Sequence, residues 1–130
     1  MKKITSVLMV VLCGILFIGC GASKLSSNYN EKDLRTASEN IVNFLVEGKY
    51  DDIVNMGDDE LKSKLTTDMI KKAYTPLQDK LGKYKEIEKI VFQEKDGIAI
   101  AVVIANYENG KAQFTLSFNT HMKMVGIYMK

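Results

Sequence analysis

The stretch FQEKDGIAIAVVIANYENGKAQFTLSF, from Phe92 to Phe118, decides the fold of this chain. From Tyr84 onward the side chains follow a period of two, which is the pattern of a β-strand. The dipeptides Asp96-Gly97 and Asn109-Gly110 interrupt this pattern, and both favour the left-handed dihedrals of a tight type I′ turn. The stretch therefore predicts two successive β-hairpins.

The two turns fix which side chains share a face of the sheet. A two-residue turn at Asp96-Gly97 puts Phe92 opposite Ala101. One at Asn109-Gly110 puts Phe114 opposite Ala105. Because side chains alternate between faces, both turns place one set on a single face: Ile90, Phe92, Ala101, Val103, Ala105, Phe114, Leu116 and Phe118. We expect this face to lie against helices, and the opposite face to be partly covered or to form an interaction surface.

The strands and helices follow from the same periodicities. We expect strands at Tyr84–Glu94, Ile98–Tyr107, Ala112–Asn119 and Met122–Met129. Apolar gaps of three and four predict helices upstream, at Glu31–Val46, around Ile53, from Asp58 through Leu65, and from Thr66-Thr67 to Gly82, with a kink before Pro76. Helices followed by a strand meander define an α+β domain, in which N-terminal helices cover a curved antiparallel sheet of about four strands.

Composition excludes some classes of protein. With 46% hydrophobic and 26% charged residues, the 130-residue chain is typical of a folded protein. Lys2 and Lys3 belong to the N-terminal segment, so the remaining 16 basic residues balance 16 acidic ones. Nucleic-acid binding needs clustered basic residues, and we therefore expect no nucleic-acid partner.

The N-terminus predicts export and lipid attachment. A positive start at Lys2-Lys3 and an apolar run from Ile4 to Ile18 are typical of a secretory signal. The following Gly19-Cys20 ends the sequence Leu16-Phe17-Ile18-Gly19-Cys20, which resembles the lipobox of bacterial lipoproteins, with Phe17 in the place where Leu is commonest. The resemblance implies a diacylglyceryl thioether on Cys20 and cleavage between Gly19 and Cys20.

This prediction divides the chain into three parts. Residues 1–19 form the signal peptide, residues 20–30 the lipidated cysteine with a flexible tether, and residues 31–130 a single α+β domain. Cys13 then belongs to the discarded peptide. The alternative is an uncleaved anchor, although the 4–18 run is shorter than the roughly 20 residues that span a bilayer. We expect the protein at the outer face of the cell membrane, held there by its lipid.

Three segments resemble one known family. They are LVEGKYDDIVNM (Leu45–Met56), LKSKLTTDMIKKAYTPLQDKLGKYKEI (Leu61–Ile87) and the strand meander that follows. Together they resemble the domain of unknown function 3887 family, a small domain of bacterial, mainly Gram-positive, lipoproteins that also occurs ahead of α/β-hydrolase domains. The resemblance implies a cone similar to nuclear transport factor 2, with helices against a strongly curved sheet. It implies no catalytic residues, and the chain contains no Gly-x-Ser-x-Gly nucleophile motif.

Candidate reactive sites are few. His121 is the single histidine and is expected at a solvated turn between strands. The neighbouring Met122 and Met124 suggest a copper(I) site, but on a strand they face away from His121. The acids of DDIVNMGDDE lack the calcium-loop pattern, since Val54 and Met56 occupy ligand positions. We therefore predict no catalytic residue, no metal and no cofactor.

Three hypotheses for function follow. The first is a membrane-anchored, non-catalytic module that binds a protein partner or a small apolar ligand. The second is a small-pocket isomerase or dehydratase, in which Tyr74, Tyr84 or Tyr107 would pair with a carboxylate at a core opening. The third is an accessory structural subunit. A deep cavity with two polar groups would favour the enzyme, whereas an exposed apolar groove would favour the binding module.

Overall fold

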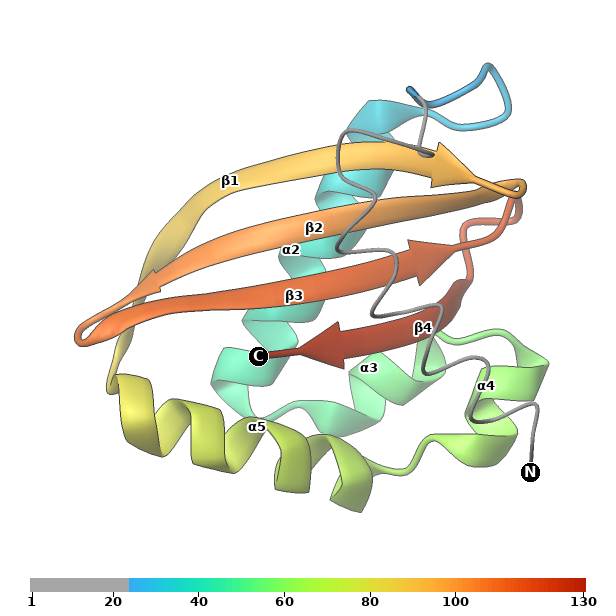
Figure 1. Cartoon of the computed structure of the whole chain (residues 1–130). Coiled ribbons are helices and arrows are strands. Elements are labelled where there is room, and N and C mark those ends of the chain that lie inside the picture. Colours follow the sequence, from blue (N-terminus) through green and yellow to red (C-terminus); the bar gives the residue numbers. More distant parts are fainter. Residues whose placement is uncertain (1–23) are drawn as a thin grey trace.

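The computed structural model describes residues 24–130, in which a group of helices covers one face of a curved sheet (Figure 1). The helices are α2 (Glu31–Glu47), α3 (Tyr50–Asn55), α4 (Asp59–Lys64) and α5 (Thr67–Leu81). The strands are β1 (Tyr84–Lys95), β2 (Ile98–Tyr107), β3 (Gly110–Phe118) and β4 (Met124–Met129). Neighbouring strands are antiparallel in the order β1-β2-β3-β4. The predicted α+β class, with helices preceding an antiparallel sheet, is confirmed.

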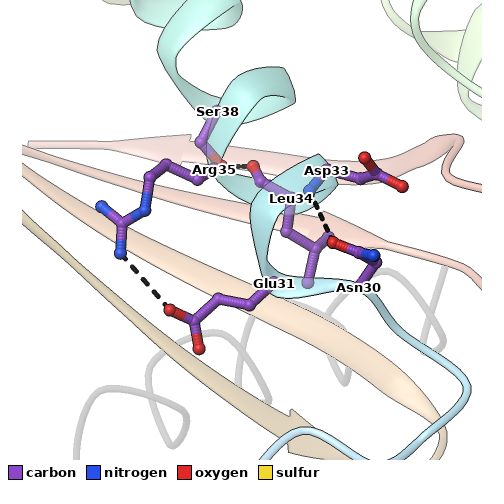
Figure 2. A network of polar contacts seen from close by, with 6 residues as sticks. All are labelled: Asn30, Glu31, Asp33, Leu34, Arg35 and Ser38. Carbon is purple, nitrogen blue, oxygen red and sulfur yellow. Dashed lines mark hydrogen bonds and ion pairs between the residues drawn. The ribbon is translucent and has the colours of Figure 1, made fainter.

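The first long helix begins and ends at residues suited to those positions. The Asn30 side chain accepts a hydrogen bond from the Asp33 backbone N–H at 3.1 Å, which satisfies one open donor of the first turn (Figure 2). At the other end Gly48 adopts a left-handed conformation (φ 76°), and the Lys49 N–H donates to the Phe44 carbonyl at 2.8 Å. The helix predicted over Glu31–Val46 is therefore confirmed, and it ends one residue later, at Glu47.

The later helices also start at polar caps. The side chain of Asp58 accepts from the Leu61 N–H at 2.8 Å and starts α4. The Thr66 hydroxyl accepts from the Met69 N–H at 3.2 Å and starts α5. α5 then passes through Pro76 as one continuous helix and ends at Gly82.

The first hairpin has the predicted register. Phe92 pairs with Ala101, and Asp96 and Gly97 have positive φ values of 53° and 81°, as a type I′ turn requires. Toward the start of β1 the ladder contains two register shifts, one between Tyr84 and Glu86 and one between Ile87 and Lys89.

The predicted register of the second hairpin is wrong by two residues. Phe114 pairs with Val103, and Tyr107 pairs with Gly110, so the two turn residues are Glu108 and Asn109. Neither has a positive φ, and the turn is therefore not type I′. The reason is tertiary: the Glu108 N–H donates to the Lys83 carbonyl at 2.9 Å and the Asn109 N–H to the Leu81 carbonyl at 2.8 Å.

The expected inner face of the sheet survives this error, because a shift of two residues leaves every side chain on its original face. Seven of the eight predicted residues are buried: Ile90, Ala101, Val103, Ala105, Phe114, Leu116 and Phe118. The eighth, Phe92, is partly buried, and the Arg35 guanidinium lies 5.2 Å from its ring centroid. The opposite face is mixed, with Val102 buried and Val91 41% exposed.

The last strand begins later than predicted. Met122 has a φ of 60° and lies in the preceding turn rather than on a strand. The Asn119 side chain holds this turn, accepting from the backbone N–H of His121 at 2.9 Å and of Lys123 at 3.1 Å. β4 therefore starts at Met124, and His121 lies in a turn as expected.

The packed part of the chain reaches back to Tyr29, which the sequence placed in the tether. Its ring is 8% exposed, and its hydroxyl donates to the Gly97 carbonyl oxygen at 2.6 Å. The Ser26 N–H also donates to the Glu94 carboxylate at 2.8 Å. The segment before α2 is thus fastened to the turn between β1 and β2.

Candidate functional site

An apolar groove of about 280 Å³ lies between α5 and β4. Met69, Ile70 and Ala73 form its helical wall, since Ala73 lies three and four positions after the other two and residues at these spacings share one face of a helix. Ile127 and Met129 come from β4, where residues two apart point to the same side of the sheet. Leu65, at the C-terminal end of α4, and Tyr128 complete the lining.

The lining determines what the groove can do. Tyr128 is the single lining residue with a hydroxyl, and none has a carboxyl, amide or amine group. Met69 is 51% exposed, although large apolar side chains are usually buried. Methionine side chains adapt their shape to different ligands. The groove is therefore suited to hold apolar groups, and its own side chains offer no acid–base pair for catalysis.

The three tyrosines named from the sequence come together elsewhere, between α5 and the strands β1 and β2. The Tyr74 and Tyr107 hydroxyls lie 2.7 Å apart in a hydrogen bond, and both side chains are buried. The Tyr84 ring meets the Tyr107 ring edge-on, with centroids 5.5 Å apart. The sequence named these tyrosines as candidates to pair with a carboxylate at a core opening, but Tyr74 bonds to Tyr107 instead.

The surroundings of the pair favour the neutral phenol. Burial raises the pKa of Tyr107, and the hydrogen bond with Tyr74 raises it further. Burial also raises the pKa of Tyr74, and its hydrogen bond opposes this shift only in part. A phenol with a raised pKa is a weaker general acid at neutral pH, so the pair is suited to a structural role.

The other candidates stay apart. Among residues 24–130, no three His, Cys, Asp or Glu side chains gather in a way that could hold a metal ion. In the same part of the chain, no helix combines the length and hydropathy needed to cross a membrane. Gly19 and Cys20, the predicted cleavage and lipidation residues, lie outside the described residues.

The groove itself was missed by reasoning from the sequence. The apolar residues of α5 were identified as a helix face, and β4 as the last strand, but the pattern does not show which helix lies beside which strand edge. One local signal was present: the run MVGIYM, Met124 to Met129, contains no charged residue and no proline. An uncharged strand at the end of a meander indicates an edge that another chain can approach.

Within residues 24–130, the geometry defines a small α+β domain in which four helices precede an antiparallel meander of four strands. The chain belongs to the family of proteins of unknown function DUF3887, whose sequence model matches residues 38–127. The fold is similar to the NMR structure of a protein from Ruminococcus gnavus ATCC 29149, with a TM-score of 0.72 and 20% identity over 83% of this chain and 97% of that one. At this identity the similarity concerns the fold alone. A comparison with curated proteins gave no match.

Proposed function

We propose that the protein is a lipid-anchored, non-catalytic binding module at the outer face of the cell membrane, and that it receives an apolar group in the groove between α5 and β4. The observation that carries the binding role is the groove, with its apolar lining and the exposed Met69 at its wall. The anchor rests on the sequence, in which an apolar run after two lysines ends at Gly19-Cys20. The likeness to nuclear transport factor 2 stays a prediction.

Binding is favoured over catalysis by what surrounds the polar groups. The groove holds no pair of polar side chains within hydrogen-bond reach. The buried tyrosine hydroxyls of Tyr74 and Tyr107 satisfy each other at 2.7 Å, and neither residue lines the groove. A small-pocket enzyme would need such groups to face its substrate.

Methionine methyl groups provide a direct test of the groove. The chain has seven methionines, of which Met69 and Met129 line the groove and Met56, Met122 and Met124 do not. The full-length protein, labelled with ¹³C at its methionine methyls, is titrated with the capped amino acid N-acetylphenylalaninamide. We expect the Met69 and Met129 signals to shift in a saturable way, because the probe's ring lies against them, while the other signals stay in place.

Two matched variants complete the experiment. Met69→Lys places a charge at the groove and should abolish the shift of Met129. Val91→Lys makes the same change at another exposed apolar residue, 41% exposed against 51% for Met69, and should leave the titration unchanged. A uniform response of all methionine signals, or none, would contradict the proposed binding role.

A further inference from the structure

The open edge of β4 adjoins the groove. At the end of the strand, the Gln113 N–H donates to the Lys130 carbonyl at 2.8 Å and the Lys130 N–H to the Gln113 carbonyl at 3.0 Å. Hydrogen-bonded pairs alternate along an antiparallel ladder. The backbone N–H and C=O groups of Ile127 and Met129 therefore point away from β3, and within residues 24–130 no fifth strand pairs with them.

A short segment around Gly57 already occupies the start of the fifth-strand position. The Met124 N–H donates to the Met56 carbonyl at 2.8 Å, and the Asp58 N–H donates to the Met124 carbonyl at 2.9 Å. These bonds form a parallel bridge between Gly57 and Met124. The chain then turns into α4 at Asp58, its N-cap. Among residues 24–130, no strand pairs on this side of Ile127–Lys130, a length of about 13 Å at roughly 3.3 Å per residue, and this position is continuous with the bridge.

The two edges of the sheet differ in their protection against other strands. Charged residues and irregular pairing are the usual defences of an edge strand. β1 has both: half of its twelve residues are charged, and it has two register shifts. β4, with the sequence MVGIYM, has no charged residue. Its single register shift lies at its start, beside Phe118, away from the open groups.

The groove is large enough to receive one apolar side chain. Its volume of about 280 Å³ lies at the small end of the range for ligand sites, which is about 300–1,000 Å³. A strand added at the edge would direct every second side chain toward the helix side of the sheet, where Ile127 and Met129 already point. Backbone hydrogen bonds would supply affinity and the groove would select an apolar residue, as in known β-strand addition.

We propose that the edge of β4 binds an extended, uncharged segment of another protein as a fifth strand, with one apolar side chain of that segment inserted in the groove between α5 and β4. This inference deepens the proposed function and rests on it. It rests on two features that lie side by side. The edge of β4 has no charged residue and has two backbone positions that β3 does not bond, and the adjacent groove is large enough for one apolar side chain.

The test uses peptides selected from a random heptapeptide display library on the full-length protein in nanodiscs. Each amide nitrogen of a selected peptide is then methylated in turn. We expect methylation at alternate positions to weaken binding at least about tenfold, since a bond of roughly 1.4 kcal/mol is lost there, and the intervening positions to tolerate it. The backbone amides of Ile127 and Met129 should exchange hydrogen rapidly in the free protein and slowly with the peptide bound.

Met129 offers a matched pair of variants. Met129→Pro removes an N–H that points away from β3, so no bond of the sheet is lost, and it should weaken the peptide about tenfold or more. Met129→Leu keeps the N–H and an apolar side chain at the groove, so it should weaken the peptide clearly less than Met129→Pro does. Failure to select any peptide, tolerance of methylation at every position, or a dimer whose Ile127 amide is protected without peptide would overturn the inference. If the capped phenylalanine still shifts Met69 in that case, the proposed function stands and only the strand addition fails.

Discussion

At the scale of single residues, the tyrosine pair shows how burial changes chemistry. Tyr74 and Tyr107 carry hydroxyls into the core, where an unpaired polar group would cost about 1–3 kcal/mol. They avoid this cost by bonding to each other at 2.7 Å. In exchange the pair must stay neutral, because burial raises the pKa of both phenols. Stability therefore depends on pH at the alkaline end.

The double variant Tyr74→Phe/Tyr107→Phe tests this dependence. The folded pKa of each tyrosine lies above the unfolded value of 10.0, so the contribution is complete below pH 10 and is lost as the pH rises toward the folded pKa. Between pH 10 and 11 the free energy of unfolding of the wild type should fall by about 2 kcal/mol more than that of the double variant. Each tyrosine contributes at most about 1 kcal/mol to this difference. Urea unfolding at several pH values measures the difference, and parallel curves would refute the neutral pair.

From the sequence these tyrosines were candidates to pair with a carboxylate at a core opening, and the sequence did not show which group each hydroxyl would meet. Tyr74 follows the helical spacing of α5, and Tyr107 ends β2 as predicted. Which hydroxyl meets which partner depends on the tertiary arrangement of α5 against the sheet, which no local period encodes. Tyr29 is a similar case: a polar, small-residue context suggested a tether, although its ring is buried against the first hairpin turn.

At the scale of elements, two glycines end the two long helices in different ways. Gly48 has φ 76° and ψ 17°, and an added Cβ would meet nothing within 4 Å. Gly82 has φ 81° and ψ −147°, close to the region that only glycine occupies. There an added Cβ would lie 2.7 Å from a carboxylate oxygen of Glu108, which accepts the Lys83 N–H at 2.9 Å. Gly82 thus joins α5 to both β1 and the β2–β3 turn.

Alanine substitution separates these two roles. Gly82→Ala should lower the free energy of unfolding by about 2–3 kcal/mol, from backbone strain together with the clash at Glu108. Gly48→Ala should cost about 1 kcal/mol, from the left-handed conformation alone. Chemical denaturation of both variants in the same buffer provides the comparison. Equal losses would show that neither the backbone conformation of Gly82 nor its contact with Glu108 adds to the cost.

The second hairpin shows where prediction from sequence reached its limit. Alternation and the two glycine dipeptides were enough to give the number of strands, their faces and the register of the first hairpin. The second turn moved by one residue because Leu81 and Lys83 hold Asn109 and Glu108 through backbone bonds. Gly110 is needed for close approach, since a Cβ there would lie 2.9 Å from Leu81. The preference of the Asn109-Gly110 dipeptide for a turn carries no information about contacts with the end of α5.

At the scale of the whole molecule, the start of the domain and the groove lie at different ends. Tyr29 is fastened beside the turn between β1 and β2, and α2 leads from there toward the end of the molecule that holds α5 (Figure 1). A lipid on Cys20 would lie nine residue steps before Tyr29, a span of at most about 30–32 Å at roughly 3.3–3.6 Å per residue. The proposed anchor would therefore keep the first hairpin turn near the membrane and leave the groove free to meet a partner.

Serine variants of the two cysteines test the anchor. Both residues have the same thiol, but we expect a lipid on Cys20 alone. Cys20→Ser should abolish incorporation of radiolabelled palmitate and release the protein from the membrane fraction, because no thioether can form at position 20. Cys13→Ser should keep both, because we expect this residue in the peptide that is removed. Stable attachment to the membrane needs two signals such as two acyl chains. The fraction of protein released from the membrane should therefore follow the fraction that lacks the lipid. Label that persists in Cys20→Ser and disappears in Cys13→Ser would reverse the assignment and place the attachment within the apolar run.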